Sequence, residues 1–239
     1  MLFVAQVYAQ TPTHYYVEMK TSKGDLLLKL YNETPQHRDN FKKLVKEGYF
    51  DSLLFHRVIH NFMIQGGDPQ SKDAVAGQAL GSGGPTYRVP AEIRTDIIHK
   101  KGALGAARDN NPEKASSASQ FYLVQGRSYS QAGLDSLQEL RMKGVKFTDK
   151  QRQMYTTIGG TPHLDGNYTV FGEILQGLDV VDVIAKVKTN AQDRPEENVR
   201  MAMRMLGKGE AENLERVQNG LKPKKSLLKK SKRKDYTIQ

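Results

Sequence analysis

The apolar residues of this chain fall in short runs separated by turns and loops, and this spacing limits the fold more than any other feature. Residues 16–21 and 26–30 flank the turn Ser22-Lys-Gly-Asp25, a pattern typical of a β-hairpin. Further β-like runs lie at 55–58, 62–65, 103–107, 120–124, 169–173 and 199–206. Many short strands with long loops predict a mainly β fold, a closed eight-stranded antiparallel barrel.

Two helices should cap this barrel. Thr34-Pro35 has the residue types of a helix start, with Thr as N-cap and Pro at the first helical position. An apolar stripe follows in the next turns, and Gly48 should end the helix. Residues 177–184 predict the second helix, short and amphipathic.

Residues 127–158 differ from the rest, because their composition is helical. Leu134, Leu137 and Leu140 lie near one face of a predicted helix. The sequence Thr148-Asp-Lys-Gln151 matches a capping box and should start a second helix. We therefore expect an inserted helical hairpin within a domain that spans residues 15–206.

Charge is concentrated at the C-terminal end. The formal net charge of the 239-residue chain is +10, but residues 220–239 carry eight Lys and Arg against one Asp, a net of +7. The body is only mildly basic. Residues 207–239 predict a polar, loosely ordered basic tail, and a block of like charge is more often solvated than bound to nucleic acid. We therefore expect no specific nucleic-acid binding.

The N-terminal residues resemble the end of a secretory signal, since Val7-Tyr-Ala9 is a small-residue cleavage pattern. We interpret residues 1–14 as a signal remnant and an N-terminal arm, and expect a periplasmic or exported protein. A basic segment before the apolar stretch is missing, so a cytoplasmic location is the alternative. No apolar run is long enough to span a bilayer, and the chain has no cysteine, which excludes disulfides and thiolate chemistry.

Several motif matches fail on inspection. His56 and His60 have the spacing of a zinc helix, but Arg57 stands where that motif requires glutamate. The glycine-rich stretch 77–85 lacks the Lys-Ser/Thr of a phosphate loop. The serines at 116–119 lack the elbow glycines of a hydrolase. We expect no metal and no cofactor.

One ordered set of motifs remains. It comprises Phe55-His-Arg-Val-Ile59, Phe62-Met-Ile-Gln-Gly-Gly-Asp68, Ser119-Gln-Phe-Tyr-Leu123, Leu164-Asp-Gly166 and Val170-Phe-Gly172. This set closely resembles the cyclophilin family of peptidyl-prolyl cis-trans isomerases over residues 15–206, interrupted at 127–158. Gly81-Ser-Gly-Gly-Pro85, Pro90-Ala-Glu92 and residues 102–108 add to the resemblance.

The resemblance implies a catalytic pair, Arg57 and Gln65. Arg57 would direct a hydrogen bond to the prolyl nitrogen, and Gln65 would orient Arg57 and contact the substrate carbonyl. Substrates would be exposed X-Pro segments of unfolded or flexible polypeptides, bound by a monomer. The implied substrate-binding residues are Phe62, Met63, Arg108 (through its backbone), Gln120, Tyr122, His163, Leu164 and Tyr168.

Taken one at a time, these residues have simpler interpretations. Arg57 alone would be a surface salt-bridge residue, and Phe62, Met63 and Leu164 alone would be core. A non-catalytic proline-peptide binding or chaperone module is the alternative function. An RNA-associated factor that uses the basic tail is a weaker one.

The chain also departs from the family pattern. His163 stands where members that bind cyclosporin tightly usually have tryptophan, so we expect weak cyclosporin binding. Tyr168 replaces a common histidine, Tyr122 the second phenylalanine of Ser-Gln-Phe-Phe, and Arg108 a common asparagine. The Tyr122 hydroxyl must find water or a partner. Both ends of the insertion lie near the presumed groove, so it extends that groove or forms a partner surface, or else it packs on the barrel without a role.

Overall fold

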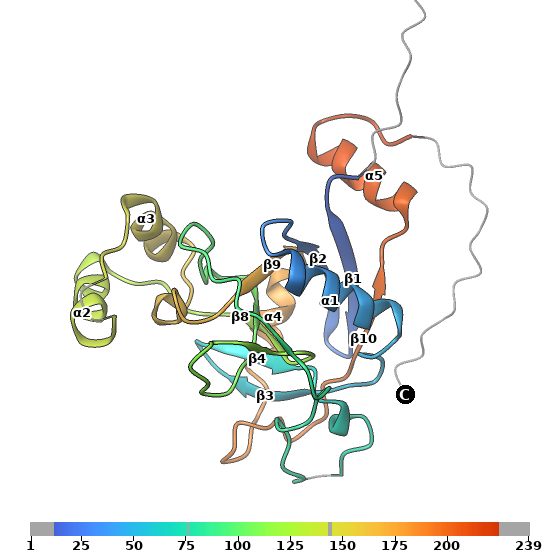
Figure 1. Ribbon diagram of the computed structural model, residues 1–239, viewed down its shortest axis with the longest axis horizontal. Helices are drawn as coiled ribbons and strands as arrows, with labels where there is room; N and C mark the ends of the chain where they lie inside the picture. Colours follow the sequence, from blue (N-terminus) through green and yellow to red (C-terminus); the bar gives the residue numbers. More distant parts are fainter. Residues whose placement is uncertain (1–11, 76, 143–144, 225–239) are drawn as a thin grey trace, which may run out of the picture.

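A computed structural model of the chain describes residues 12–75, 77–142 and 145–224, and its main element is a curled sheet of eight strands (Figure 1). All the strand pairs are antiparallel, in the order β10-β1-β2-β9-β6-β8-β4-β3. The strands are β1 (Tyr15–Thr21), β2 (Gly24–Leu30), β3 (Phe55–Ile59), β4 (Met63–Gly66), β6 (Ala103–Ala106), β8 (Phe121–Val124), β9 (Val170–Gln176) and β10 (Met201–Met205). The mainly β prediction is confirmed.

The barrel is more open than the sequence predicts. The edge strands β3 and β10 do not pair with each other along their length. One isolated bridge, between Leu54 and Arg200, joins the two edges. Backbone bonds from Phe55 to Val199 (2.9 Å) and from Met201 to Leu53 (2.8 Å) lie beside it. The sheet therefore curls almost into a cylinder, and irregular chain closes the last gap.

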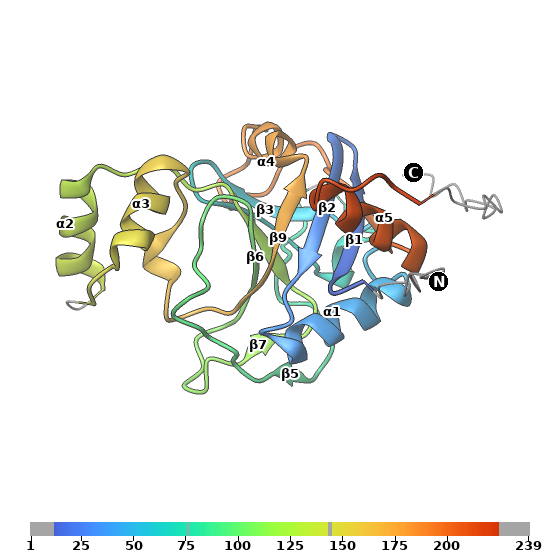
Figure 2. The same cartoon turned by 90° about the horizontal axis from the view of Figure 1, so that it is seen from above.

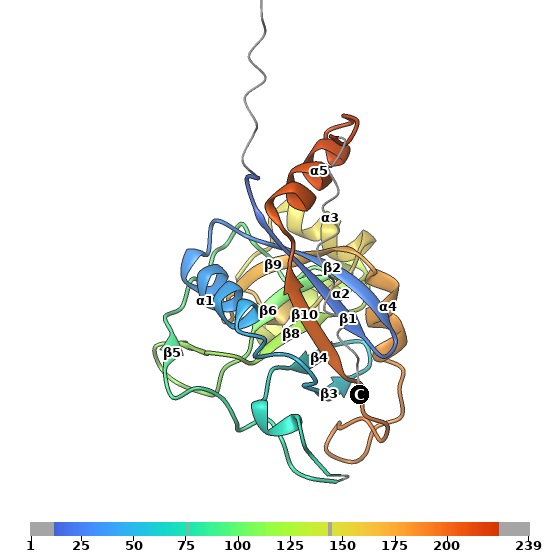
Figure 3. The same cartoon turned by 90° about the vertical axis from the view of Figure 1, so that its right-hand side faces the viewer.

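Two helices cover the ends of the curled sheet, as predicted. Helices α1 (Pro35–Lys46) and α4 (Leu178–Ile184) lie on opposite sides of the strands when the molecule is seen from above or from one end (Figures 2 and 3). Phe41 of α1 and Val181 of α4 belong to one large buried cluster with Leu28 and Phe121 from the strands. The barrel interior and both helices thus share one apolar core.

The start of α1 is capped from another part of the chain. Pro35 is at the first helical position as predicted, but the Thr34 side chain makes no capping hydrogen bond. Instead the carboxylate of Glu92 accepts bonds from the backbone N–H groups of Gln36 (3.0 Å) and His37 (2.9 Å). A carboxylate at this end also complements the positive end of the helix dipole.

The predicted helical insertion is present. It contains α2 (Gln131–Arg141) and α3 (Asp149–Thr157), and Thr148 with Gln151 forms the predicted capping box. The hairpin projects from one end of the molecule (Figures 1 and 2). Reciprocal backbone bonds between Arg127 and Gly160, at 3.3 and 3.0 Å, hold its two ends together.

Residues beyond the last strand are not all loosely ordered, so that prediction is wrong for α5 (Lys208–Gln218). Glu215 on α5 accepts hydrogen bonds from the backbone of Thr13 (2.8 Å) and from the Tyr16 hydroxyl (3.0 Å) at the start of β1. This contact attaches the helix to the first strand, at the end of the molecule opposite the insertion (Figure 2). The most basic stretch, residues 225–239, and the signal-like residues 1–11 lie outside the described residues.

Short elements complete the chain. A separate pair of short strands, β5 (Arg88–Val89) and β7 (Ser116–Ser117), lies outside the runs that the sequence predicts as strands. Two 3-10 turns, η1 (Pro69–Ser71) and η2 (Pro162–Leu164), flank the motifs singled out above. Among the helices of the described ranges, none combines the length and apolarity needed to cross a membrane.

Candidate active site

The candidate catalytic residues come together because three neighbouring strands align them. Arg57 on β3 lies opposite Gln65 on β4, and Gln65 lies opposite Tyr122 on β8. Directly opposed residues of an antiparallel pair share a face. Met63 lies two positions from Gln65 and so faces the same way. The intervening Ile64 belongs to the barrel core, so these four residues occupy the outer face of the sheet.

Arg57 is the exposed cation of this face. Its side chain is 45% exposed, and its Nε atom lies 3.5 Å from a carboxylate oxygen of Asp193. Both partners are well exposed, so the pair contributes little to stability. The salt-bridge interpretation of Arg57 is therefore accurate as far as it goes, but most of the guanidinium N–H groups remain open to a ligand.

Gln65 is held by Gln120 rather than by Arg57. The Gln65 amide donates to the side-chain oxygen of Gln120 at 3.0 Å. The Gln120 amide in turn donates to the carbonyl oxygens of Gly81 (2.9 Å) and Gly83 (2.8 Å). Gln120 is buried. Both of its amide hydrogens are therefore committed to the glycine-rich loop while its oxygen accepts from Gln65, so its side chain fixes Gln65 relative to that loop.

An apolar cluster, referred to below as the pocket, adjoins this pair. Met63, Tyr122 and Leu164 are buried in a cluster separate from the barrel core, and Phe62 and Tyr168 pack against it. The ring of Tyr122 fits because β6 has a glycine opposite it. A Cβ atom at Gly105 would lie 2.3 Å from the Tyr122 ring. The predicted pocket residues are thus brought together on the outer face of the sheet.

Arg108 and Tyr168 form one side of this pocket. The Arg108 guanidinium lies 4.6 Å from the centre of the Tyr168 ring, a distance typical of a cation–π contact. It also donates to the carbonyl oxygen of Asn167 at 3.0 Å. The Arg108 side chain is therefore committed to the pocket wall, which fits the expectation that its backbone, not its charge, faces substrate.

His163 and Phe62 form the opposite rim. Their rings stack with centroids 5.5 Å apart and an interplanar angle of 26°. Burial lowers the pKa of His163, and the nearby Arg141 lowers it further. The imidazole is therefore mainly neutral at pH 7 and behaves as a flat, polar-edged surface next to Phe62.

A buried hydrogen-bond network behind the pocket was not predicted from the sequence. Nε2 of His99 is bonded to the Tyr122 hydroxyl at 3.0 Å, and Nδ1 donates to Asp165 at 2.7 Å. The other oxygen of Asp165 accepts from the hydroxyl of Tyr155, at 2.5 Å. Tyr155 lies on α3, so the insertion is linked to the pocket residue Tyr122 through two side chains.

The arrangement suits chemistry without a nucleophile. An accessible cation stands beside a polar amide and an apolar cluster. Among the residues that the structure describes, no cluster of three or more His, Asp or Glu could hold a metal ion. Such a site can bind an apolar ring and donate hydrogen bonds to a neutral atom attached to it.

A comparison with known protein families identifies the family of this chain. The profile of the family described as cyclophilin type peptidyl-prolyl cis-trans isomerase/CLD matches residues 16–204. This chain belongs to the cyclophilin family. Its reaction is the rotation of peptide bonds that precede proline, which the resemblance of the motifs implied.

Curated relatives carry the same activity in their names. A Staphylococcus haemolyticus protein named "Putative peptidyl-prolyl cis-trans isomerase" is 34% identical over 184 residues, which are 77% of this chain and 86% of that protein. A Staphylococcus aureus protein of the same name is 37% identical over 183 residues, 75% of this chain and 85% of that one. A Streptococcus pyogenes "Putative bifunctional phosphatase/peptidyl-prolyl cis-trans isomerase" is 38% identical, but this chain spans only 37% of its length.

Solved structures confirm the fold. A cyclophilin of Cryptosporidium parvum has a TM-score of 0.59 and 20% identity, with 81% of this chain and 98% of that chain covered. A second structure of the same description, obtained in the presence of the dipeptide Ala-Pro, has a TM-score of 0.58.

Proposed function

We propose that Arg57 and Gln65 catalyse the isomerisation and that the outer-face pocket holds the proline ring. The observation that carries the proposal is the alignment of Arg57, Gln65 and Tyr122 across three strands, with the guanidinium accessible beside buried apolar side chains. The substrates are proline-containing segments of unfolded or flexible polypeptides, and the reaction assists their folding.

The chemistry needs little more than a well-placed donor. The peptide bond resists rotation by about 18–20 kcal/mol because the nitrogen shares its lone pair with the carbonyl. A hydrogen bond from Arg57 to the prolyl nitrogen favours the pyramidal nitrogen of the twisted state, in which that lone pair is localised. A group that binds the twisted state better than either planar isomer lowers the barrier.

Gln65 and Gln120 have different parts in this proposal. Gln65 contacts the substrate carbonyl as it turns. Gln120 is a positioning residue, because its amide is already engaged by Gly81, Gly83 and Gln65. The pocket residues bind the ring and exclude water from it.

The deciding experiment measures isomerisation of an Ala-Pro tetrapeptide by the intact protein and by Arg57→Ala. We expect kcat/KM to fall at least about tenfold, since the loss of one transition-state donor typically costs that much or more. Asp193→Asn is the matched control, because it removes the partner of Arg57 and keeps the guanidinium. A folded Arg57→Ala protein with the full rate would refute the role of Arg57.

Binding and isomerisation assays of the intact protein also distinguish catalysis from binding alone. If it binds proline peptides but does not accelerate their isomerisation, the chain is a proline-peptide binding or chaperone module. The accessible guanidinium beside Gln65 favours catalysis, because a pure binder does not need that pair.

We further propose that the protein binds cyclosporin weakly. The imidazole of His163 occupies a rim position stacked on Phe62 and has a smaller ring than the indole usual in tight binders. Calorimetric titration should show tighter binding by His163→Trp than by the natural protein, and equal affinities would contradict the proposal.

Export is a separate proposal, supported only by the cleavage-like pattern Val7-Tyr-Ala9. The mass of the mature protein and cell fractionation test it. A cytoplasmic protein that keeps residues 1–9 would overturn it.

A further inference from the structure

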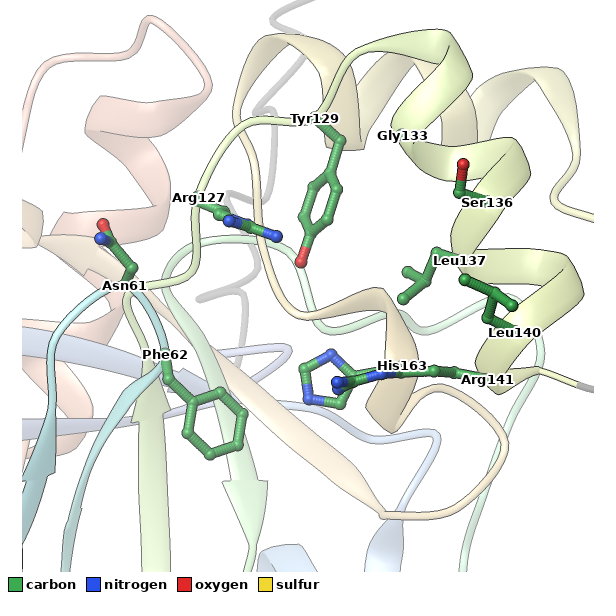
Figure 4. A pocket seen from close by; sticks show the side chains of 10 residues that line it. All are labelled: Asn61, Phe62, Arg127, Tyr129, Gly133, Ser136, Leu137, Leu140, Arg141 and His163. Carbon is green, nitrogen blue, oxygen red and sulfur yellow. The ribbon is translucent and has the colours of Figure 1, made fainter.

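A second hollow lies next to the proline pocket, between the barrel and the insertion. It is a cleft of about 630 Å³. Figure 4 shows its two walls. One comes from the barrel and from the chain at Arg127, where the insertion begins, and the other comes from helix α2. The lining residues are Asn61, Phe62, Arg127, Tyr129, Gly133, Ser136, Leu137, Leu140, Arg141 and His163.

The cleft is continuous with the proline pocket. Phe62 packs against the buried pocket cluster and also lines the cleft. His163, stacked on Phe62, is the residue next to Leu164 of the pocket. A polypeptide whose proline occupies the pocket must extend in both directions from it. One side of the pocket leads over the Phe62–His163 rim directly into the cleft.

The cleft carries positive charge without a counter-charge. Arg127 and Arg141 line it, and no Asp or Glu does. Arg127 lies 5.1 Å from the centre of the Tyr129 ring. Figure 4 shows Arg141 extending from the end of α2 toward the imidazole of His163. Within the described residues neither guanidinium forms an ion pair with a carboxylate, unlike Arg152 on α3, which is paired with Asp135.

The opposite wall is apolar and open. Leu137 and Leu140 project from α2 into the cleft (Figure 4). Leu140 is 82% exposed, whereas Leu134 of the same helix packs into the insertion core. An apolar surface beside two unpaired cations fits a ligand that has an apolar and an acidic side chain close together.

The cleft wall formed by helix α2 is held in place relative to the barrel. The Arg127–Gly160 bonds hold the two ends of the insertion, and Tyr155 is bonded to Asp165 behind the pocket. The cleft therefore exists before substrate arrives, and binding there does not require ordering of the helices.

We propose that this cleft is a substrate subsite that binds residues flanking the proline and favours an acidic side chain next to an apolar one. The occupant is the same polypeptide whose proline enters the pocket, so the inference rests on the proposed function. The insertion thereby extends the groove and gives the enzyme a sequence preference beyond proline.

Matched peptides test this preference. Every peptide of the series has the same Ala-Pro core. Each carries Glu, Gln or Lys at one of the three positions before or after that core, with a leucine next to the varied residue. We expect Glu peptides to have kcat/KM about fivefold above the Gln peptides on one side of the proline, which corresponds to about 1 kcal/mol for an exposed ion pair. Lys peptides should be the poorest substrates.

Two variants locate the effect. In Arg127→Gln/Arg141→Gln, the ratio of Glu to Lys peptides should fall to about one. Lys150→Gln is the matched control, because it removes one positive charge from an exposed position of α3 that does not line the cleft. There the ratio should be unchanged.

The outcomes distinguish this inference from the proposed function. Equal kcat/KM for Glu, Gln and Lys peptides at every position, with activity still dependent on Arg57, overturns the subsite and leaves the mechanism intact. A Glu preference that persists in the double variant also overturns it. If the intact protein shows no isomerisation, fluorescence anisotropy of the same labelled peptides still reports whether Glu improves binding through Arg127 and Arg141.

Discussion

The barrel and the insertion differ in the size of their buried apolar cores. The barrel buries a large apolar cluster shared by strands and by helices α1 and α4. The core of the insertion consists, within the described residues, of the buried side chains Leu134, Phe147 and Tyr155, with a few partly buried neighbours. The hydroxyl of one of these three, Tyr155, donates a hydrogen bond to Asp165 of the barrel domain.

This difference indicates that the insertion depends on the barrel for its structure. Three buried side chains cannot offset the conformational entropy of two ordered helices. The barrel, in contrast, has a core that does not involve the insertion. The proposed chemistry lies on the self-sufficient part and the proposed specificity on the dependent part, so the two should respond differently to mutation.

The largest effect is expected from the barrel core. Phe121 contacts the rings of Phe41, Phe50 and Phe55. Phe121→Ala should lower the free energy of unfolding by about 3–5 kcal/mol, because it leaves a cavity in a tightly packed cluster. Leu134→Ala in the insertion should instead raise hydrogen exchange mainly within residues 130–157.

Urea denaturation and exchange mass spectrometry check this pair of variants. If Leu134→Ala lowers the global free energy of unfolding as much as Phe121→Ala, the insertion and the barrel are one cooperative unit. The comparison drawn above would then be wrong.

Acid should destabilise the barrel through His56. This side chain is buried, neither ring nitrogen has a partner among the described residues, and burial lowers its pKa to about 4. Asp68 raises this pKa, while Arg57 and Arg194 lower it. Below pH 6.5 the unfolded chain binds a proton that the folded chain resists. Stability should therefore fall between pH 6.5 and pH 4 and level off below, by roughly 3 kcal/mol in total.

The control for this effect is His56→Gln, which cannot be protonated. It should flatten the slope of unfolding free energy against pH in that window, apart from the smaller contributions of the other histidines with lowered pKa, His14, His37 and His163. An equal slope in the natural protein and in His56→Gln would mean that another group controls acid stability.

The smallest effect is expected at the link between the two regions. Tyr155→Phe removes one hydrogen bond from Asp165 and should cost about 1–2 kcal/mol. Because Asp165 holds His99, which contacts Tyr122, KM for proline peptides should rise while kcat changes little. Tyr87→Phe is the matched control, since it loses an exposed hydrogen bond to Asn40 and belongs neither to the pocket cluster nor to the His99 network. Identical kinetics in the two variants would show that the link is only structural.

Strands and helices could be predicted from the sequence because their signals are local. The Thr148–Gln151 capping box and the apolar stripe of α1 both depend on residues a few positions apart. The pocket was predicted through its motifs, and the structure brings those residues to one face of the sheet.

What could not be predicted depends on distant residues. Glu92 caps α1 from 55 residues away. Tyr155 and His99 acquire their role only through Asp165, and nothing in their own neighbourhood in the sequence marks them. Helix α5 was missed because it is polar, and its attachment to β1 through Glu215 is a contact between opposite ends of the domain.

The paired glycines at the base of the insertion have a consequence for how this enzyme can diversify. A Cβ atom at Gly126 would lie 2.4 Å from the backbone of Gly160, so the chain leaves the barrel and returns to it at practically one point. A loop that starts and ends at one point does not strain its host, and its closure entropy grows only with the logarithm of its length. Replacing residues 127–159 by a four-residue turn would change that entropy by about 2 kcal/mol. Loop closure therefore sets little limit on the length of the insertion, and exchanging it would cost the barrel chiefly the hydrogen bond between Tyr155 and Asp165.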